Sequence, residues 1–137
     1  MTRDESPQPI TALIVDDEAP ARRRLVRMLG EMADVEVVGE AESGDDAVVQ
    51  IAELEPDVVF LDIQMPGLNG FGVINAVGAE EMPLVVFVTA FDEHAVAAFE
   101  VRALDYLLKP VAPQRLAGAI ARVREILSTP HGAESDR

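Results

Sequence analysis

The stretch VVFLDIQMPG, residues 58–67, combines an apolar run, an acidic residue and a turn. Val58 to Leu61 contains no polar residue, which is typical of a parallel strand buried on both faces. Asp62 directly follows this strand, and Pro66-Gly67 supplies the chemistry of a turn. Because parallel strands are joined by helical crossovers, the stretch predicts an α/β sheet with a carboxylate at the end of one strand.

Four further strands are predicted around this stretch. Residues 10–15 and 84–88 are nearly continuous apolar runs of the same kind, so we expect them in the interior of the sheet. The segment 35–40 mixes charged residues into its apolar pattern, and the run 106–108 is short. These two segments suit the edges of the sheet.

Helical patterns fill the gaps between the strands. Pro20 suits the first turn of one helix, and Ser43 with Asp46 resembles a capping box at the start of another. The first predicted helix has an apolar face from Ala21 to Met32, with Gly30 near its end, and the last has an apolar face from Leu116 to Leu127. The helices between them are predicted at residues 43–54, 71–77 and 92–99, the last with Asp92 as N-cap. Right-handed crossovers then give a flavodoxin-like (βα)5 doubly wound sheet, with parallel strands in the order 2-1-3-4-5 and helices on both faces.

Length and composition indicate one globular domain. A chain of 137 residues suits a single core, which we expect at residues 10–127, after a disordered arm (1–9) and before a linker or tail (128–137). No apolar run approaches the length of a membrane span, and the first residues show no secretion signal. We therefore expect no membrane partner and a cytoplasmic location. The absence of Cys excludes disulfides, thiolate metal sites and Cys nucleophiles.

The charge of the chain is strongly acidic. A formal net charge of −14 disfavours direct contact with nucleic acid, because phosphate backbones repel it. The basic cluster Arg22, Arg23, Arg24 and Arg27 lies on one predicted helix. It is either a solvated helix face or a surface that docks a partner.

Chemically complementary residues follow four of the predicted strands. Asp16 and Asp17 follow the first strand, Asp62 the third, Thr89 the fourth and Lys109 the fifth. In a sheet of this order, ligands bind beyond the carboxyl ends of the strands, where the order reverses. Carboxylates brought close together repel one another unless a cation lies between them, and an oxygen-only ligand set suits Mg²⁺. A Mg²⁺ held by carboxylates usually serves a phosphate, to which the Lys and Thr side chains can contribute a positive charge and a hydroxyl donor.

Four blocks of sequence resemble the signature of response-regulator receiver domains of two-component signalling. They are residues 15–18 (VDDE), 59–67 (VFLDIQMPG), 88–90 (VTA) and 108–110 (LKP), in the usual order and at the usual spacings. The resemblance covers roughly residues 10–127. The stretch 89–110 is similar, more narrowly, to receivers of the LytTR (AlgR/LytR) class.

The resemblance implies a role for each residue of the acidic site. Asp62 is expected to accept a phosphoryl group from a sensor histidine kinase or a small donor. Asp17 would bind Mg²⁺ directly, Asp16 largely through water, and Gln64 through its main-chain carbonyl. Lys109 would pair with a phosphoryl oxygen and precede a cis proline. The chain would be a phosphoacceptor with Mg²⁺-dependent self-phosphorylation and autodephosphorylation rather than an enzyme.

The resemblance also implies a conformational switch. Thr89 and Ala90 would contact the phosphoryl group, and Thr89 would move inward to reach it. Tyr106 would then rotate from an exposed to a buried position and change the face made by helix four, strand five and helix five; the alternative is an edge-strand aromatic that only packs. Gln64 and Phe91 occupy positions that tune dephosphorylation in this family, and we expect the Phe91 ring to slow it.

The partners expected from this resemblance are a kinase, a second copy of the chain and an output domain. Helix four is unusually apolar, which predicts homodimerisation on phosphorylation. The LytTR resemblance predicts control of transcription through a DNA-binding domain that these residues do not contain. A stand-alone response regulator remains an alternative.

Three other functions share some of these sequence features. A haloacid-dehalogenase-like Mg²⁺-dependent phosphatase also uses Asp, Mg²⁺, Thr and Lys, but it needs an acid two residues after its nucleophile, where this chain has Gln64. An FMN-binding flavodoxin needs a phosphate-cradling loop after the first strand, where the acidic residues 16–18 would repel phosphate. A degenerate receiver that signals without phosphate would lack some of the chemical positions, all of which are filled here.

Overall fold

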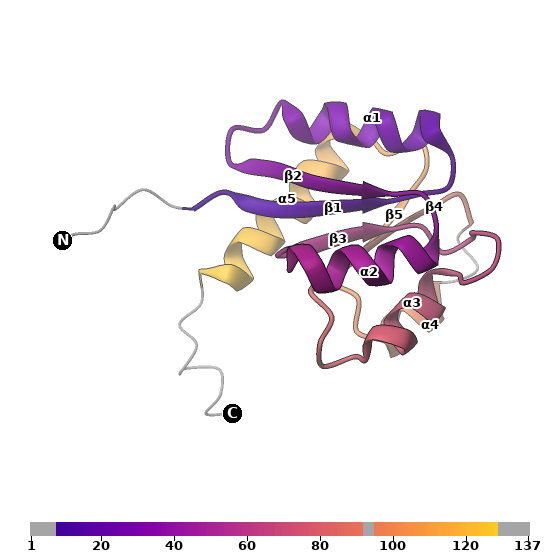
Figure 1. Ribbon diagram of the computed structural model, residues 1–137. Helices are drawn as coiled ribbons and strands as arrows, with labels where there is room; N and C mark the ends of the chain where they lie inside the picture. The colour runs from indigo at the N-terminus through magenta and orange to yellow at the C-terminus, as the bar shows by residue number, and fades with distance from the viewer. Residues whose placement is uncertain (1–7, 92–94, 129–137) are drawn as a thin grey trace.

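Five strands alternate with five helices in the part of the chain that the structure, a computed structural model, describes: residues 8–91 and 95–128 (Figure 1). The elements are β1 (Ile10–Val15), α1 (Ala19–Gly30), β2 (Val35–Ala41), α2 (Gly44–Leu54), β3 (Val58–Leu61), α3 (Gly70–Val77), β4 (Leu84–Thr89), α4 (Ala95–Glu100), β5 (Asp105–Leu108) and α5 (Pro113–Leu127). Three predictions concern residues outside this described part: the arm at residues 1–7, the tail at residues 129–137, and Asp92 as N-cap of the fourth helix.

The strands form one parallel sheet in the order β2-β1-β3-β4-β5, which confirms the predicted flavodoxin-like arrangement. β1 lies between β2 and β3, and Val15 pairs with Leu61. The next residues along the two strands therefore emerge side by side. The amide of Asp62 extends the pairing by one step, because it donates to the carbonyl of Val15 at 3.0 Å. The order and register of the strands in the sheet thus bring Asp16 next to Asp62.

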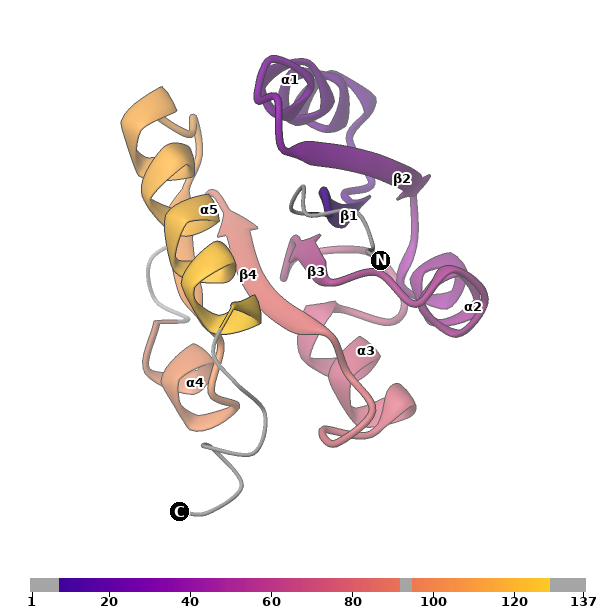
Figure 2. The same cartoon turned by 90° about the vertical axis from the view of Figure 1, so that its left-hand side faces the viewer.

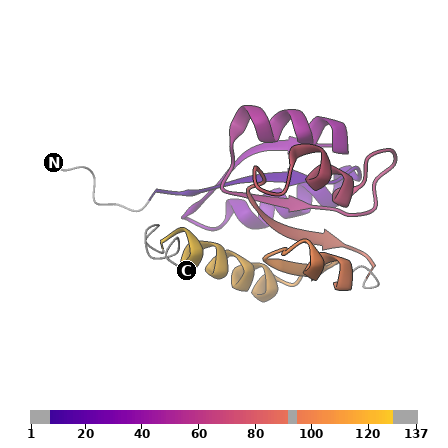
Figure 3. The same cartoon turned by 90° about the horizontal axis from the view of Figure 1, so that it is seen from below.

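Helices cover both faces of the sheet. α1 and α5 lie on one face and α2 and α3 on the other (Figure 2). Viewed from below, the orange α4 and the yellow α5 lie on the β4–β5 side of the sheet, away from the purple α2 (Figure 3). Each interior strand sends alternate residues into the two cores, as a doubly covered sheet requires.

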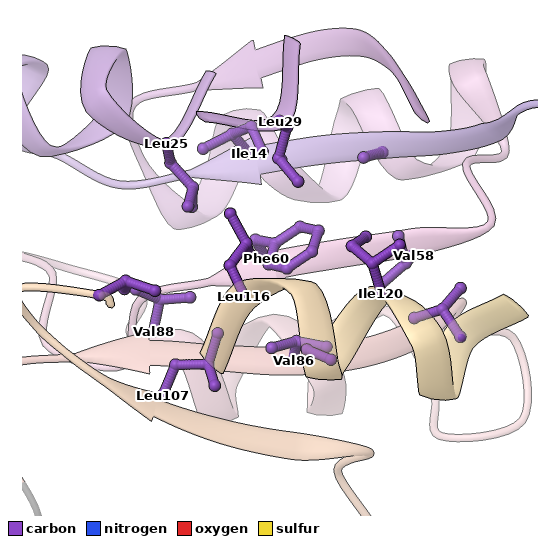
Figure 4. Packing of buried hydrophobic residues seen from close by; sticks show 14 of the residues in the cluster. Ile14, Leu25, Leu29, Val58, Phe60, Val86, Val88, Leu107, Leu116 and Ile120 are labelled. Atoms are coloured by element: carbon purple, nitrogen blue, oxygen red, sulfur yellow. The ribbon is translucent and has the colours of Figure 1, made fainter. Parts of the chain in front are cut away.

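The core beneath α1 and α5 is continuous across the sheet (Figure 4). Phe60 of β3 is fully buried at its centre, with Leu29 of α1 and Leu116 of α5 packed around it. On the opposite face, Leu61 and Phe87 pack against α2 and α3. Burial of a large side chain of this kind stabilises the fold by about 1.5–3 kcal/mol. The two cores therefore fix the relative positions of the strand ends.

The helix boundaries follow local chemistry. Ser43 caps α2, since its hydroxyl accepts a hydrogen bond from the amide of Asp46 at 3.1 Å, as predicted. α1 ends at Gly30, so Met32 lies beyond the helix, although it still packs against the core beneath α1 and α5. α5 begins at Pro113, earlier than predicted, because proline suits the first turn of a helix. None of the helices in the described part of the chain combines the length and the apolar character needed to cross a bilayer.

Candidate functional site

Three carboxylates gather where β1 and β3 end. Asp16 and Asp62 are each 4% exposed, whereas Asp17 is exposed. One carboxylate oxygen from each of the three residues lies within 4.8 Å of the others. The structure thus brings together the three acidic residues that the sequence analysis selected. Oxygen atoms at this separation form a ligand set that suits a hard divalent cation such as Mg²⁺.

Lys109 reaches this cluster from β5. Its amide donates to the carbonyl of Thr89 at 2.8 Å, so the residue continues the pairing of β5 with β4. Its Nζ lies 2.7 Å from Oδ2 of Asp16 and 3.1 Å from Oδ2 of Asp62. The Lys109–Pro110 peptide is cis, as the resemblance implied. Oε1 of Glu18 lies farther from the ammonium nitrogen, at 3.8 Å. Several carboxylates therefore surround the Lys109 ammonium, and the cluster keeps a net negative charge that a divalent cation can balance.

The burial of the site changes the acidity of two of its groups. Burial raises the pKa of the Asp62 carboxyl, and the nearby charge of Asp16 adds to this effect. The ammonium group of Lys109 and the amide of Gln64 act in the opposite direction but do not cancel it. For Lys109, burial acts to lower the pKa, but the hydrogen bond to Asp16 and the charge of Asp62 outweigh it, so its pKa is raised. Lys109 therefore stays positively charged at neutral pH.

The loop after β3 is folded tightly around Asp62. The amide of Gln64, an exposed residue, donates to Oδ1 of Asp62 at 3.3 Å. The amide of Gly70 donates to the carbonyl of Ile63 at 3.0 Å. A Cβ atom at residue 70 would lie 2.6 Å from the carbonyl oxygen of Asp62. The start of α3 thus approaches Asp62 more closely than any residue with a side chain allows.

Thr89 and Tyr106 are linked to each other through Phe91. Thr89 is fully buried, and its Oγ1 accepts a long hydrogen bond, 3.4 Å, from the amide of Phe91. The hydroxyl of Tyr106, a half-buried residue, donates to the carbonyl of Phe91. Its ring packs edge-on against Phe87 at a centroid distance of 6.3 Å. Ala90 and Phe91 are exposed. The structure connects the two expected switch residues through one short segment after β4.

Two arginines of the basic cluster contact the main chain beside the site, which the sequence analysis did not foresee. Nη1 of Arg22 donates to the carbonyl of Asp16 at 2.6 Å, and Nη2 of Arg24 donates to the carbonyl of Val111 at 2.8 Å. Both residues lie in the helix that directly follows the acidic pair Asp16-Asp17, and that position is the signal that could have located them.

A cleft of about 310 Å³ opens next to the carboxylate cluster, between α1 and the turn after β5. Asp16 and Lys109 line its polar end, and Leu25, Met28 and Val111 contribute apolar surface. Asp16 and Lys109 therefore belong both to the carboxylate site and to the wall of this cleft.

Comparison with known proteins places this geometry in a family. The family model described as the response regulator receiver domain matches residues 12–121. The chain belongs to this family. Receiver domains are components of two-component signalling, and an acidic cluster of the observed kind is consistent with Mg²⁺ binding in them.

Individual relatives agree with this assignment. The chain is 50% identical to an uncharacterized response regulatory protein of Vibrio parahaemolyticus over 119 residues, covering 87% of this chain and 49% of that protein. It is 47% identical to the transcriptional regulatory protein BtsR of Escherichia coli K12 over 116 residues, which cover 85% of this chain and 48% of BtsR. The chain thus spans about half the length of the curated relatives it matches.

Solved structures show the same fold. The REC domain of AraT, a response regulator from Geobacillus stearothermophilus, superposes with a TM-score of 0.77 at 34% identity, covering 85% of this chain and 94% of that chain. The response regulatory domain of mrkE from Klebsiella pneumoniae also gives a TM-score of 0.77, at 32% identity, covering 85% and 96%.

Proposed function

We propose that this receiver is a phosphorylation-dependent signalling switch in which Asp62 accepts a phosphoryl group. The observation that carries the proposal is the placement of Asp62 beside two further carboxylates, within 4.8 Å, and 3.1 Å from the ammonium of Lys109. The carboxylate supplies the nucleophile. The ammonium is a positive charge that can pair with a phosphoryl oxygen.

Asp16, Asp17 and the main-chain carbonyl of Gln64 are proposed to hold Mg²⁺ together with Asp62. The donor set fits the ion, because it consists of oxygen atoms and Asp17 is open to solvent, which leaves room for bound water. When bound, Mg²⁺ supplies a positive charge that offsets the charge on the transferring phosphoryl group. The protein contributes alignment, since Gln64 and Lys109 each fix one oxygen of the Asp62 carboxylate.

The transfer itself is a displacement at phosphorus. One carboxylate oxygen of Asp62 forms a bond to phosphorus, and the bond from phosphorus to the donor atom breaks. When the donor is a phosphohistidine, the electron pair of that bond stays on the imidazole nitrogen. A sensor histidine kinase is the proposed donor protein.

The readout is proposed to be a rearrangement of the segment after β4. A phosphoryl group on Asp62 presents acceptor oxygens for the hydroxyl of Thr89 and the amide of Ala90. When Thr89 moves inward, its present hydrogen bond from Phe91 is lost, and the contact between Phe91 and Tyr106 is disturbed. Tyr106 is then released to take a more buried position, which changes the face formed by α4, β5 and α5.

This face has apolar residues that could join two phosphorylated copies. Leu108 of β5 is 46% exposed, and Val101 after α4 is 37% exposed. Light scattering with and without beryllofluoride, a phosphate mimic, tests dimerisation; a monomer under both conditions contradicts it. The output is proposed to be transcription, through a LytTR-type DNA-binding domain outside these residues, acting in the cytoplasm. A stand-alone regulator is the alternative.

Intact-mass analysis tests the central proposal. The wild type, incubated with acetyl phosphate and Mg²⁺, is expected to gain the mass of one phosphoryl group, and a chelator should abolish the gain. Asp62→Asn should show no gain under any condition. Asp45→Asn, at an exposed acidic residue of α2, is the matched control and should behave as the wild type. A mass gain in Asp62→Asn would contradict the assignment of the phosphoacceptor.

A further inference from the structure

Asp16 is held at both ends of its main chain and at both carboxylate oxygens. Its amide donates to the carbonyl of Ala41 at 3.1 Å, and its carbonyl accepts from Nη1 of Arg22 at 2.6 Å. Its Oδ1 accepts from the amide of Glu18 at 2.9 Å, and its Oδ2 contacts Lys109 at 2.7 Å. Of these four contacts, the one from Arg22 fixes the peptide that joins Asp16 to Asp17.

The guanidinium of Arg22 is itself held in place. Its Nε donates to Oε1 of Glu40, at the end of β2, at 3.1 Å. The Arg22 side chain is only 15% exposed, while that of Glu40 is 44% exposed. Because guanidinium is planar, contacts through Nε and Nη1 determine the direction in which the group points. Arg22 therefore links the end of β2 to the turn between β1 and α1.

α1 begins without a hydrogen bond to the side chain of its N-cap residue, Glu18. A peptide unit is planar, so the contact of Arg22 with the Asp16 carbonyl also orients the bond to the Asp17 Cα atom. Asp17 is exposed, unlike Asp16 and Asp62, so its carboxylate is not fixed by burial in a core. Its position depends mainly on its main chain.

We propose that Arg22 is a positioning residue, which fixes the Asp16–Asp17 turn so that both carboxylates are aligned for a divalent cation. The inference rests on the Mg²⁺ site of the proposed function and adds to it a residue from outside the ligand set. Groups that orient metal ligands through hydrogen bonds typically change metal affinity by about 10–100-fold when they are removed. Arg22 acts in this way through a main-chain carbonyl.

The alternative is that Arg22 simply offsets the negative charge of the cluster. The two roles predict opposite changes in Mg²⁺ affinity when the charge of Arg22 is removed. Removal of a nearby positive charge should strengthen the binding of a cation, because the local potential becomes more negative. Loss of positioning should weaken it, because the carboxylates are no longer held in the geometry that binds the ion. The Mg²⁺ affinity of an uncharged variant therefore separates the two roles.

Isothermal calorimetry with MgCl2 on the whole chain makes this test, without any phosphoryl donor. The chain has no Trp, so heat is a more direct readout than fluorescence. Arg22→Gln is expected to weaken Mg²⁺ binding about tenfold or more. Arg23→Gln, at an exposed neighbour on the same helix, removes the same charge and should leave the affinity unchanged or slightly higher. Arg22→Lys keeps the charge but cannot reproduce the two-point contact, so it should bind Mg²⁺ less tightly than the wild type.

The outcomes are distinguishable. Binding by Arg22→Gln that is equal to or tighter than that of the wild type overturns the proposal. If circular dichroism shows that Arg22→Gln is unfolded without metal, Arg22→Lys decides, and wild-type affinity in that variant overturns it. If the wild type binds no Mg²⁺, the proposed function fails at its metal site, and the inference about Arg22 fails with it.

Discussion

The ammonium nitrogen of Lys109 lies 3.1 Å from Oδ2 of Asp62, although the two residues are separated by 47 positions in the chain. Each group is partly removed from water, and each changes the acidity of the other. The contact joins the end of β3 to the end of β5, across β4. It therefore depends on the order of the strands in the sheet, and it provides the first prediction.

Asp62→Asn should stabilise the metal-free protein at neutral pH. Burial raises the pKa of Asp62, so the folded state disfavours its charged form relative to the unfolded state. For such a group, stability is greatest below the unfolded pKa and is lost as the pH rises through the folded pKa. The Asn side chain of the variant carries no charge, so the variant should be more stable than the wild type at neutral pH. This difference in stability should disappear in acid, where Asp62 of the wild type is protonated.

Urea unfolding with a chelator, at neutral and at acidic pH, measures this difference. Asp45→Asn removes an exposed acidic group from α2 and serves as the control, with no comparable gain expected. A stability difference between Asp62→Asn and the wild type that does not depend on pH would contradict the explanation.

Mg²⁺ should stabilise the wild type by mass action. A ligand that binds only the folded state adds about 2.7 kcal/mol to the free energy of unfolding at a concentration of 100 times Kd. Asp17→Asn removes one proposed ligand and should reduce the rise in melting temperature that Mg²⁺ causes. Differential scanning calorimetry with MgCl2 or with a chelator measures this rise. An equal rise in Asp17→Asn and the wild type would exclude Asp17 as a ligand.

Gly70→Ala should destabilise the fold by about 1–3 kcal/mol, because the new methyl group must displace main-chain atoms. Its Cβ would lie 2.6 Å from the carbonyl oxygen of Asp62. Gly118→Ala, within α5, is the matched control, since nothing lies within 4 Å of a Cβ atom there. This control should gain about 0.5–1 kcal/mol, because alanine favours a helix over glycine. Chemical denaturation of both variants measures the change in the free energy of unfolding, which should be negative for Gly70→Ala and positive for Gly118→Ala. A Gly70→Ala variant as stable as the wild type would refute the close approach.

Phe91→Ala should shorten the lifetime of the phosphorylated state. Phe91 lies just after β4 and is 43% exposed. We expect its ring to limit the access of water to a phosphoryl group on Asp62. We expect phosphate release to be faster by about threefold, which corresponds to a barrier lower by about 0.6 kcal/mol. Release of labelled phosphate gives the rate. Val49→Ala, at an exposed residue of α2, is the control, and equal rates in Phe91→Ala and wild type end this hypothesis.

One strand and two helices show which local structures the sequence patterns predicted correctly and which they did not. The apolar run 58–61 predicted a doubly buried strand, because a strand covered by helices on both faces has no polar side. The start of α2 could also be predicted from the sequence, since Ser43 caps the helix by accepting a hydrogen bond from the amide of Asp46, only three residues away. Gly30 was predicted near the end of the first helix, and α1 ends there. Met32 was predicted on the same helical face but lies beyond the helix, although it still packs against the core.

The sequence by itself determined the strands and the acidic residues that follow them, because alternation, burial and turn chemistry are local properties. The sequence also predicted that these residues meet at one edge of the sheet, whereas only the tertiary structure decided which further contacts hold them there. The approach of α3 to Asp62 at Gly70, and the reach of Arg22 to a main-chain carbonyl and to Glu40, involve distances across several elements. Main-chain carbonyls carry no residue-type signal, so such contacts become visible only when the helices are packed on the sheet.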